Sequence, residues 1–291
     1  TVHGSLGDDA QSAWLKKVIG KCKEKASFYY LSIRKHEKNE PTMLKVPLTQ
    51  TMHLKEESKG SPFYLLLVAL NNNSTSTQLL EMVETVHGNL GNDAKSIWLT
   101  GDDKEGDTPF YWLLCALRNN STSTDLLKMV DTVHGNLKGD ASTAWLKERK
   151  AGGDKGATPF YWLLGALNNN STSTKLLEMV ETVHGSLGDD AQSAWLTDRN
   201  AEDDKGATPF YWLLAALSNN RTSTRLLEMV QTVHESLGND AQSAWLTERK
   251  AEEWKGATPF YWLLAALTSN TQSTTDLMKM VETVHESLGD D

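Results

Sequence analysis

The stretch GATPFYWLLAAL at Gly206–Leu217 decides the fold of this chain, because it recurs. The same twelve residues occupy Gly256–Leu267, and near copies occupy Gly156–Leu167 and Gly106–Leu117. The Pro-Phe pairs of these copies are 50 residues apart, and 47 residues separate the first of them from the Pro-Phe pair at Pro62. A unit of about fifty residues has been copied along the chain, which predicts a repeat protein in place of two separate globular domains.

One copy shows how each unit folds. Thr158-Pro159 predicts a helix start, because a hydroxyl caps free amides and proline fits the first turn. The apolar residues between Phe160 and Leu167 then follow the spacing of one helical face, and the polar run 168–173 ends that helix and reverses the chain. A second apolar stripe from Leu176 to Leu187 predicts a second helix. Asp189-Asp190-Ala191-Gln192 predicts the start of a third, shorter helix.

No segment of the chain reads as a β-strand, so we predict an all-α fold. Each unit has one apolar side that it cannot bury alone, and stacking on its neighbours solves that problem. The predicted architecture is a helical-repeat solenoid with two to three helices per repeat. The predicted divisions are a partial repeat at 1–15, a divergent, shorter, basic repeat at 16–60, full repeats at 61–107, 108–157, 158–207 and 208–257, and a partial repeat at 258–291.

The charge of the chain is unevenly distributed. The formal net charge is −9, which disfavours a general nucleic-acid binder, yet residues 1–60 hold eleven Lys and Arg against seven Asp and Glu. The basic segment 15–48 either binds an acidic partner or is the solvated face of an atypical terminal repeat. Cys22 and Cys115 are too few for a disulfide framework or a metal cluster, which favours a reducing, cytoplasmic location.

No apolar run of membrane-spanning length and no signal peptide is present in the sequence. The chain begins and ends in the middle of a unit, so we expect it to be a fragment of a longer protein.

The repeat resembles the ankyrin repeat, in which an Asp-x-x-Gly-x-Thr-Pro-Leu-His turn precedes an inner and an outer helix. Asp103–Phe110 and Asp203–Phe210 match that turn well, and Gly153–Phe160 and Glu253–Phe260 match it less closely. Leu176–Gly185 is similar to the outer helix with its terminating glycine. The resemblance implies an ankyrin-like fold and a role in binding other proteins.

Three features depart from the ankyrin pattern. Tyrosine, as at Tyr161, replaces the usual histidine, and Leu163-Leu164 replaces a pair of alanines, so we expect wider helix spacing. The unit is also about seventeen residues longer than an ankyrin repeat, and the third helix accounts for the excess. Phe28–Leu31 precedes Phe63–Leu66 by only 35 residues, which is close to the length of the family.

The histidines are structural in this interpretation. Five of them occupy one equivalent position on the second helix, from His87 to His285, and successive copies would lie about 10 Å apart. That separation is too large for shared metal ligation, whose bonds are about 2 Å long. Asn-x-Ser/Thr sequences at Asn73, Asn120, Asn170 and Asn220 fit the glycosylation pattern, but we expect them to cap helices and to remain unmodified.

The sequence contains no recognisable catalytic triad, phosphate-binding glycine loop or zinc motif. Nearly identical copies also disfavour an enzyme, because a catalytic site needs different residue types at one place. We therefore predict a protein with no enzymatic activity, no cofactor and no metal.

The repeated tryptophan of the first helix is the main candidate for function. Trp162 lies about 200° around the helix from Phe160, so it is at the edge of the apolar stripe. The ankyrin resemblance implies a position facing a concave groove, where an aromatic row would anchor a partner. The alternative is sideways packing against the next copy. The other tryptophan series, Trp14, Trp98, Trp145, Trp195 and Trp245, is expected to pack in the core.

Positions that differ between copies are further candidates, since we expect them to be exposed. They either tune partner choice or vary neutrally on a solvated rim. The candidate partner-binding residues are Trp112, Trp162, Trp212 and Trp262, with Leu65 in the first full copy, and Arg118, Asn168, Ser218 and Thr268; the start of the second helix varies in the same way at Gln78, Asp125, Lys175 and Arg225.

The function predicted from the sequence is a non-enzymatic protein-protein interaction scaffold that binds a partner along its groove and connector tips. Two alternatives remain open at this point. One is a nucleic-acid-binding repeat array that uses the basic segment 15–48, and the other is a structural protein that self-associates head to tail.

Overall fold

The computed structural model describes residues 30–34, 41–45, 62–91, 94–100, 106–146, 157–196, 207–246, 257–268 and 274–288. The chain divides into two compact units, Thr1–Ser58 and Lys59–Asp291. The predicted partial repeat 1–15, most of the basic segment 15–48 and Cys22 lie outside the described residues.

The first unit contains a β-hairpin. Strand β1 (Tyr30–Arg34) pairs antiparallel with strand β2 (Pro41–Lys45) over five facing pairs. The prediction of a chain without strands is therefore wrong here. Leu31 and Ile33 alternate with the other residues of β1, and this period of two, with a β-branched residue, is the strand signal that the comparison with Phe63–Leu66 obscured.

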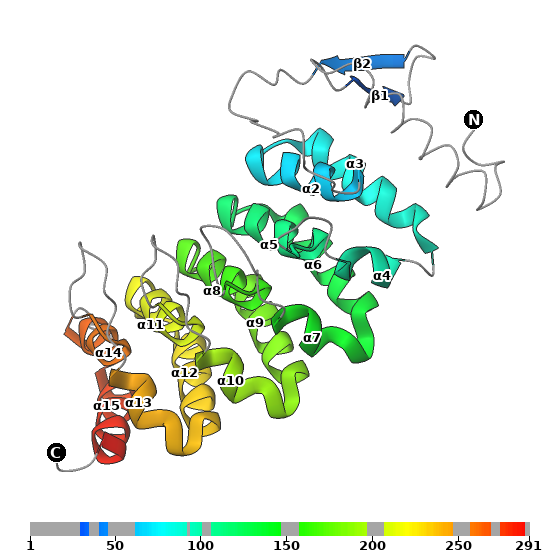
Figure 1. Ribbon diagram of the computed structural model, residues 1–291. Helices are drawn as coiled ribbons and strands as arrows, with labels where there is room; N and C mark the ends of the chain where they lie inside the picture. The colour runs from blue at the N-terminus through cyan, green and yellow to red at the C-terminus, as the bar shows by residue number, and fades with distance from the viewer. Residues whose placement is uncertain are drawn as a thin grey trace. The chain divides into compact units, whose positions relative to one another are not determined.

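The second unit is a series of helical repeats, which confirms the helical-repeat prediction for this part of the chain (Figure 1). We call the first helix of each repeat helix A, the second helix B and the third, short one helix C. The A helices are α2 (Pro62–Asn72), α5 (Pro109–Asn119), α8 (Pro159–Asn169), α11 (Pro209–Asn219) and α14 (Pro259–Thr268). The B helices are α3 (Thr77–Asn89), α6 (Thr124–Leu137), α9 (Thr174–Leu187), α12 (Thr224–Leu237) and α15 (Thr274–Leu288).

The predicted third helix is present as well. The C helices are α4 (Ala94–Leu99), α7 (Ala141–Leu146), α10 (Ala191–Leu196) and α13 (Ala241–Leu246). Short 3-10 turns precede three of them, at η3 (Lys138–Asp140), η4 (Gly188–Asp190) and η5 (Gly238–Asp240). Helix α9 ends at Leu187 because Gly188 adopts a φ of 56°, a conformation that favours glycine.

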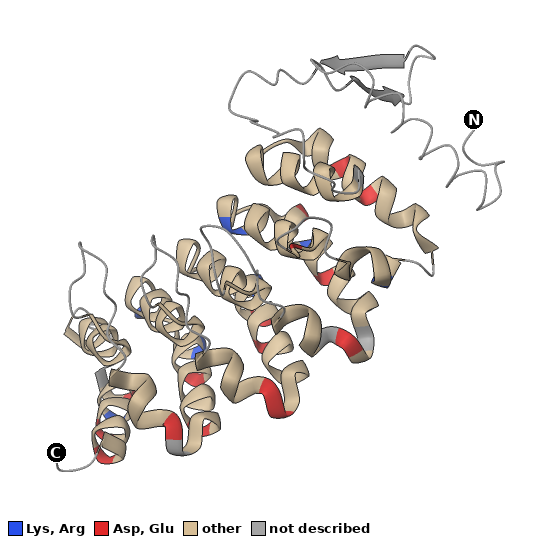
Figure 2. Cartoon of the chain, viewed as in Figure 1, with Lys and Arg blue, Asp and Glu red and all other residues tan. Residues whose placement is uncertain are grey.

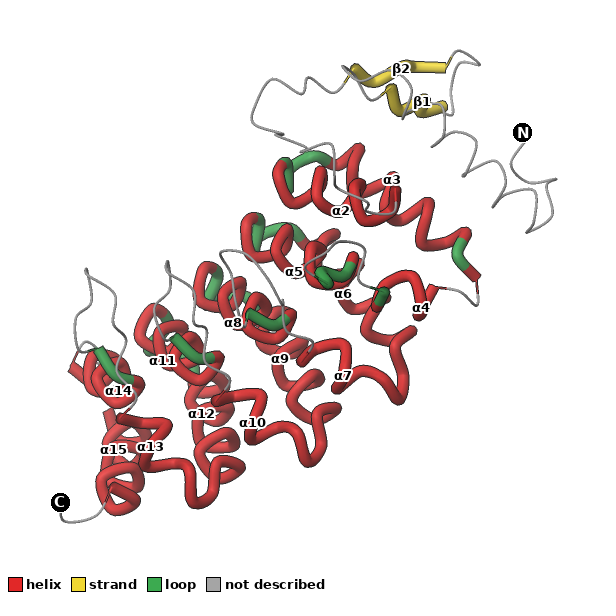
Figure 3. Tube along the Cα trace, viewed as in Figure 1, coloured by secondary structure: helices red, strands yellow, loops and turns green. Residues whose placement is uncertain are grey.

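Side chains cap the helices as the sequence predicts. The Thr158 hydroxyl accepts a hydrogen bond from the Tyr161 amide at 3.1 Å, and Pro159 occupies the first turn of α8. At the start of α9, the Ser173 hydroxyl accepts from the Leu176 amide at 3.2 Å. The polar run between these two helices therefore ends one helix and starts the next, and Figure 3 shows the resulting short loops between successive A and B helices.

The repeats pack as successive layers. Each helix A contacts helix A of the next repeat, and each helix C packs against helices A and B of the repeat that follows it. Helix C thus bridges two layers. The buried residues form one cluster that runs through all of these layers, from Phe63 to Val284. The core of the second unit is therefore a series of similar layers.

Candidate protein-interaction surface

The tryptophans of helix A form an aromatic row with the tyrosines beside them. The Tyr111 ring lies 6.2 Å from the Trp162 ring of the next repeat, edge to face at 82°. It also lies 5.6 Å from Trp112 in its own repeat. The same contacts link Tyr64 to Trp112, Tyr161 to Trp212 and Tyr211 to Trp262, with centroids 6.1–6.3 Å apart.

This row settles the two alternatives for the inner tryptophans. Trp162 is only 6% exposed and Trp212 only 8%. The expectation that they are exposed in a groove is therefore wrong, because the tyrosine ring of the preceding layer packs against each indole. Trp112, Trp262 and Leu65 are half-buried, so these three keep part of their surface available.

Arg118, another predicted contact residue, packs within the repeat stack. Its guanidinium carbon lies 4.5 Å from the centre of the Trp162 ring and 6.0 Å from that of Trp212. Gly165 makes room for it, because a Cβ at that position would lie 3.1 Å from Arg118 Nε and 3.2 Å from Cδ. The equivalent positions in the other copies hold Val68, Cys115, Ala215 and Ala265. The arginine and the glycine are therefore complementary changes in neighbouring repeats.

The remaining variable positions of helix A also contact the next repeat. Asn168 Oδ1 accepts a hydrogen bond from Asn219 Nδ2 at 3.0 Å, and Asn71 Oδ1 accepts one from Asn119 Nδ2 at 2.9 Å. Ser218 is buried, so the expectation that this position is always exposed is wrong. The reason is that the last turn of helix A faces the neighbouring turn. Thr268, in the last repeat, is exposed.

The polar run between helices A and B holds the layers together through an asparagine ladder. Asn120, Asn170 and Asn220 donate their side-chain amides to carbonyl oxygens of the preceding repeat, at Ser74, Ser121 and Ser171, over 2.9, 3.0 and 2.8 Å. These amide nitrogens are the atoms that a glycan would need. Their use between repeats favours the structural interpretation. The sequence reasoning found the caps and missed the ladder, although the exact recurrence of the Asn was its signal.

The histidines of helix B join helices B and C. Trp195 Nε1–H donates to His184 Nδ1 at 3.0 Å, and the same bond, 2.9–3.0 Å long, links Trp98 to His87, Trp145 to His134 and Trp245 to His234. All four tryptophans are fully buried, which confirms core packing for the described members of this series. Burial lowers the pKa of His184, as it does for His87, His134 and His234.

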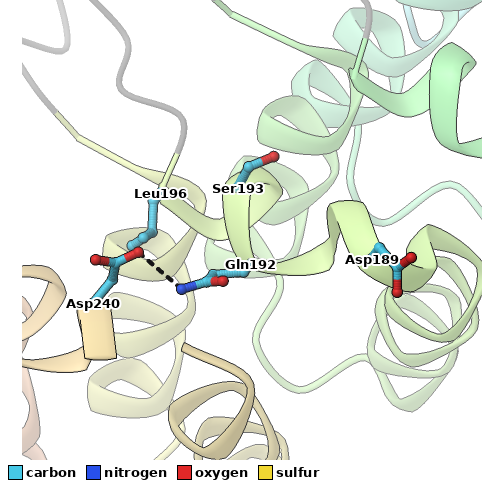
Figure 4. Close-up of a pocket in the computed structure, with 5 residues that line it drawn as sticks. All are labelled: Asp189, Gln192, Ser193, Leu196 and Asp240. Carbon is cyan, nitrogen blue, oxygen red and sulfur yellow. Dashed lines mark hydrogen bonds between the residues drawn. The ribbon is translucent and has the colours of Figure 1, made fainter. Parts of the chain in front are cut away.

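A surface depression of about 400 Å³ lies beside helix C of one repeat and the turn of the next. Asp189, Gln192, Ser193, Leu196 and Asp240 line it (Figure 4). Gln192 Nε2 donates to Asp240 Oδ2 at 2.8 Å and to the Leu237 carbonyl oxygen at 2.7 Å. Equivalent contacts join the preceding repeats, where the Ser142 hydroxyl donates to Asp190 and Lys95 forms an ion pair with Asp140. These polar groups connect successive layers.

The charged residues of the described repeats gather on one side. The B helices expose ten Asp and Glu side chains against three Lys, whereas the five described A helices carry a single charged residue, Arg118. Figure 2 shows this separation, with the acidic residues on the B helices and on the turns before helix C. The exposed acidic residues are Glu81, Glu84, Asp125, Asp131, Glu178, Glu228, Glu235, Asp276, Glu282 and Glu286.

The variable start of helix B lies on this acidic side. Gln78, Asp125 and Lys175 are exposed as predicted. Arg225 instead reaches the preceding repeat, where its guanidinium contacts the Glu178 and Glu181 carboxylates. We call the outward side of the B helices the acidic face.

Within the described ranges, no helix is long and apolar enough to cross a membrane. The same residues contain no group of three or more His, Cys, Asp or Glu side chains placed to hold a metal ion. Comparison with known proteins gives no match to a family model, to a curated protein or to a solved structure.

Proposed function

We propose that this protein is a non-enzymatic interaction scaffold, an ankyrin-like stack of helical units that binds another protein. Packing within and between the layers occupies polar and aromatic groups that recur from copy to copy, namely the Tyr–Trp row, the His–Trp bonds and the asparagine ladder. What remains for a partner is the outer surface, where Gln78, Asp125 and Lys175 differ between copies. The buried Cys115, which forms no disulfide, fits a reducing, cytoplasmic setting.

The acidic face carries this proposal. Its ten exposed carboxylates, against three exposed ammonium groups, are spread over all five described B helices, so their field extends over several layers. A partner with Lys and Arg spaced along its own surface would be attracted to this face and oriented on it. The proposed partner is therefore a protein with a basic surface, and nucleic acid is disfavoured at this face because its phosphates are repelled.

The test is affinity capture with the full chain, compared between two variants of equal charge. The first changes Glu81, Glu228 and Glu282 to Gln on the acidic face. The control changes Thr75, Thr122 and Thr172 to Lys, which alters the net charge equally at exposed turns between helices A and B.

We expect a protein captured by the wild type to be lost, or bound about tenfold more weakly, with the first variant and retained with the control. Raising the salt concentration should weaken its binding to the wild type. Equal capture by all three chains would contradict a role for the acidic face, provided that circular dichroism shows equal helix content.

A further inference from the structure

One pair of glutamates on the acidic face already holds an arginine. The Arg225 guanidinium, from the start of α12, donates through Nε and Nη2 to the two carboxylate oxygens of Glu181 at 2.9 and 2.5 Å. Its Nη1 donates to Glu178 Oε1 at 3.1 Å. The two glutamates lie on one side of α9, because residues i and i+3 are neighbours on a helix. The pair therefore receives the planar fork of an arginine that comes from another helix.

The same pair of glutamates occurs in one other described B helix. TQLLEMVE at 77–84 in α3 aligns with TKLLEMVE at 174–181 in α9, so Glu81 and Glu84 are the counterparts of Glu178 and Glu181. Both Glu81 and Glu84 are exposed, and we call them the open pair. The remaining B helices hold other residues at these two positions, namely Lys128 and Asp131 in α6, Glu228 and Gln231 in α12, and Lys279 and Glu282 in α15.

The residue opposite the open pair is acidic. Asp125 in α6 has the place that Arg225 has in α12, at the second residue of helix B in the following repeat. Because α3 and α6 pack side by side, three carboxylates occupy the positions where α9 and α12 have two carboxylates and a guanidinium. None of the described Lys and Arg side chains forms an ion pair with Glu81, Glu84 or Asp125. Like charges at this spacing repel each other, so a cation from outside the chain is attracted most strongly here.

We propose that Glu81, Glu84 and Asp125 form a site for one arginine side chain of the partner. This inference rests on the proposed function, and it names the residue that the acidic face recognises and the layer that binds it. The arginine fork lies on Glu84 and its third nitrogen on Glu81, as Arg225 lies on the pair in α9. A lysine is a poorer occupant, because an ammonium is a point charge and does not match both oxygens of a carboxylate.

The first test fills the site from within the chain and needs no partner. Asp125→Arg gives α6 the side chain that Arg225 supplies in α12, so its guanidinium should occupy the open pair. Asp276→Arg is the matched control, because it makes the same change at the same position of helix B in α15, where the facing α12 offers one glutamate of the pair and not two.

Chemical denaturation of the full chain measures the difference. We expect Asp125→Arg to unfold at a higher denaturant concentration than both the wild type and Asp276→Arg. Equal midpoints for the two variants would show that the open pair does not receive a guanidinium, and the proposal would then fail.

The second test measures the binding of labelled hexa-arginine and hexalysine peptides to the full chain by fluorescence anisotropy. We expect the wild type to bind hexa-arginine more tightly. Asp125→Arg should weaken that binding by about fivefold more than Asp276→Arg does, which corresponds to one exposed charged pair. The reverse change, Arg225→Asp, frees the pair in α9 and should strengthen binding. Lys175→Asp changes the charge equally where no pair of glutamates faces it, so it should strengthen binding less.

The outcomes separate this inference from the proposed function. If the two peptides bind equally, and Asp125→Arg acts like Asp276→Arg, the acidic face remains a binding surface but the arginine site is ruled out. If neither peptide binds the wild type, the arginine site is ruled out whatever protein the affinity capture retains.

Discussion

At the scale of single residues, differences between copies are compensated within the stack. Arg118 lies over Trp162 in space that Gly165 leaves and that the alanines of later copies would narrow. Glycine in a helix costs about 1 kcal/mol relative to alanine. A cation–π contact of this kind contributes about 0.5–1 kcal/mol or somewhat more. The two terms are similar in size, which explains why the pair is tolerated in one copy.

This balance gives a prediction for a double-mutant cycle. Gly165→Ala alone should change the free energy of unfolding little, because the gain in helix propensity is offset by displacement of Arg118. In an Arg118→Asn background, which reproduces the side chain of Asn168, the same change should stabilise the protein by about 1 kcal/mol. Chemical denaturation of the four chains measures the coupling, and additive effects would show that the two residues act independently.

At the scale of elements, the His–Trp bond is the joint between helices B and C. The indole nitrogen can only donate, so the histidine Nδ1 must be unprotonated to accept. At His87 the other ring nitrogen then carries the proton and faces Asn136, 3.1 Å from its side-chain amide, which requires the amide oxygen of Asn136 to accept. Protonation of Nδ1 would break the joint.

The joint predicts a pH dependence. Burial in the folded protein lowers the pKa of His184, whereas the pKa of this histidine in the unfolded chain is about 6.5. At a pH between the folded and the unfolded pKa, the unfolded chain therefore binds more protons than the folded protein. The stabilisation is complete above about pH 7 and is lost as the pH falls through 6.5 towards the folded pKa. Because the ring is half-buried, the loss should not exceed about 1 kcal/mol per joint.

Thermal melts between pH 5 and pH 8 measure this effect against two variants. His184→Gln keeps a hydrogen-bond acceptor that does not titrate, so its stability should fall less than that of the wild type on acidification. His285→Gln is the control, because no tryptophan of the described residues donates to His285, and it should follow the wild type. Parallel curves for the wild type and His184→Gln would exclude the joint as a source of acid sensitivity.

At the scale of the whole molecule, stability in the second unit should be a sum over layers. Helix A contacts and the bridging C helices join only neighbouring repeats, so no layer depends on a distant one.

Removal of residues 247–291 tests this. The shortened chain should keep the helical circular dichroism of the remaining repeats, with a lower unfolding midpoint. The m value is the slope of the free energy of unfolding against denaturant concentration. The part of this slope that comes from the second unit should fall by about a fifth, in proportion to the buried surface lost. Complete loss of helical structure would show that the repeats share one indivisible core.

The sequence by itself determined the period, the helices and their caps. These depend on residues close in the chain, such as Thr158-Pro159 at a helix start or Trp195 on a short apolar edge. The same local interactions therefore form again in each copy of the sequence. The hairpin of β1 and β2 was not predicted, because the likeness of Phe28–Leu31 to a helical copy outweighed the alternation of apolar residues in β1.

Only the tertiary structure decided what each side chain of a helix faces across the gap between layers. The periodicity of helix A places Trp162 at the edge of a stripe, and the same pattern fits a groove or a contact with the next repeat. The choice depends on where the Tyr111 ring of the neighbouring layer lies, and a pattern within one helix carries no information about the offset between two helices.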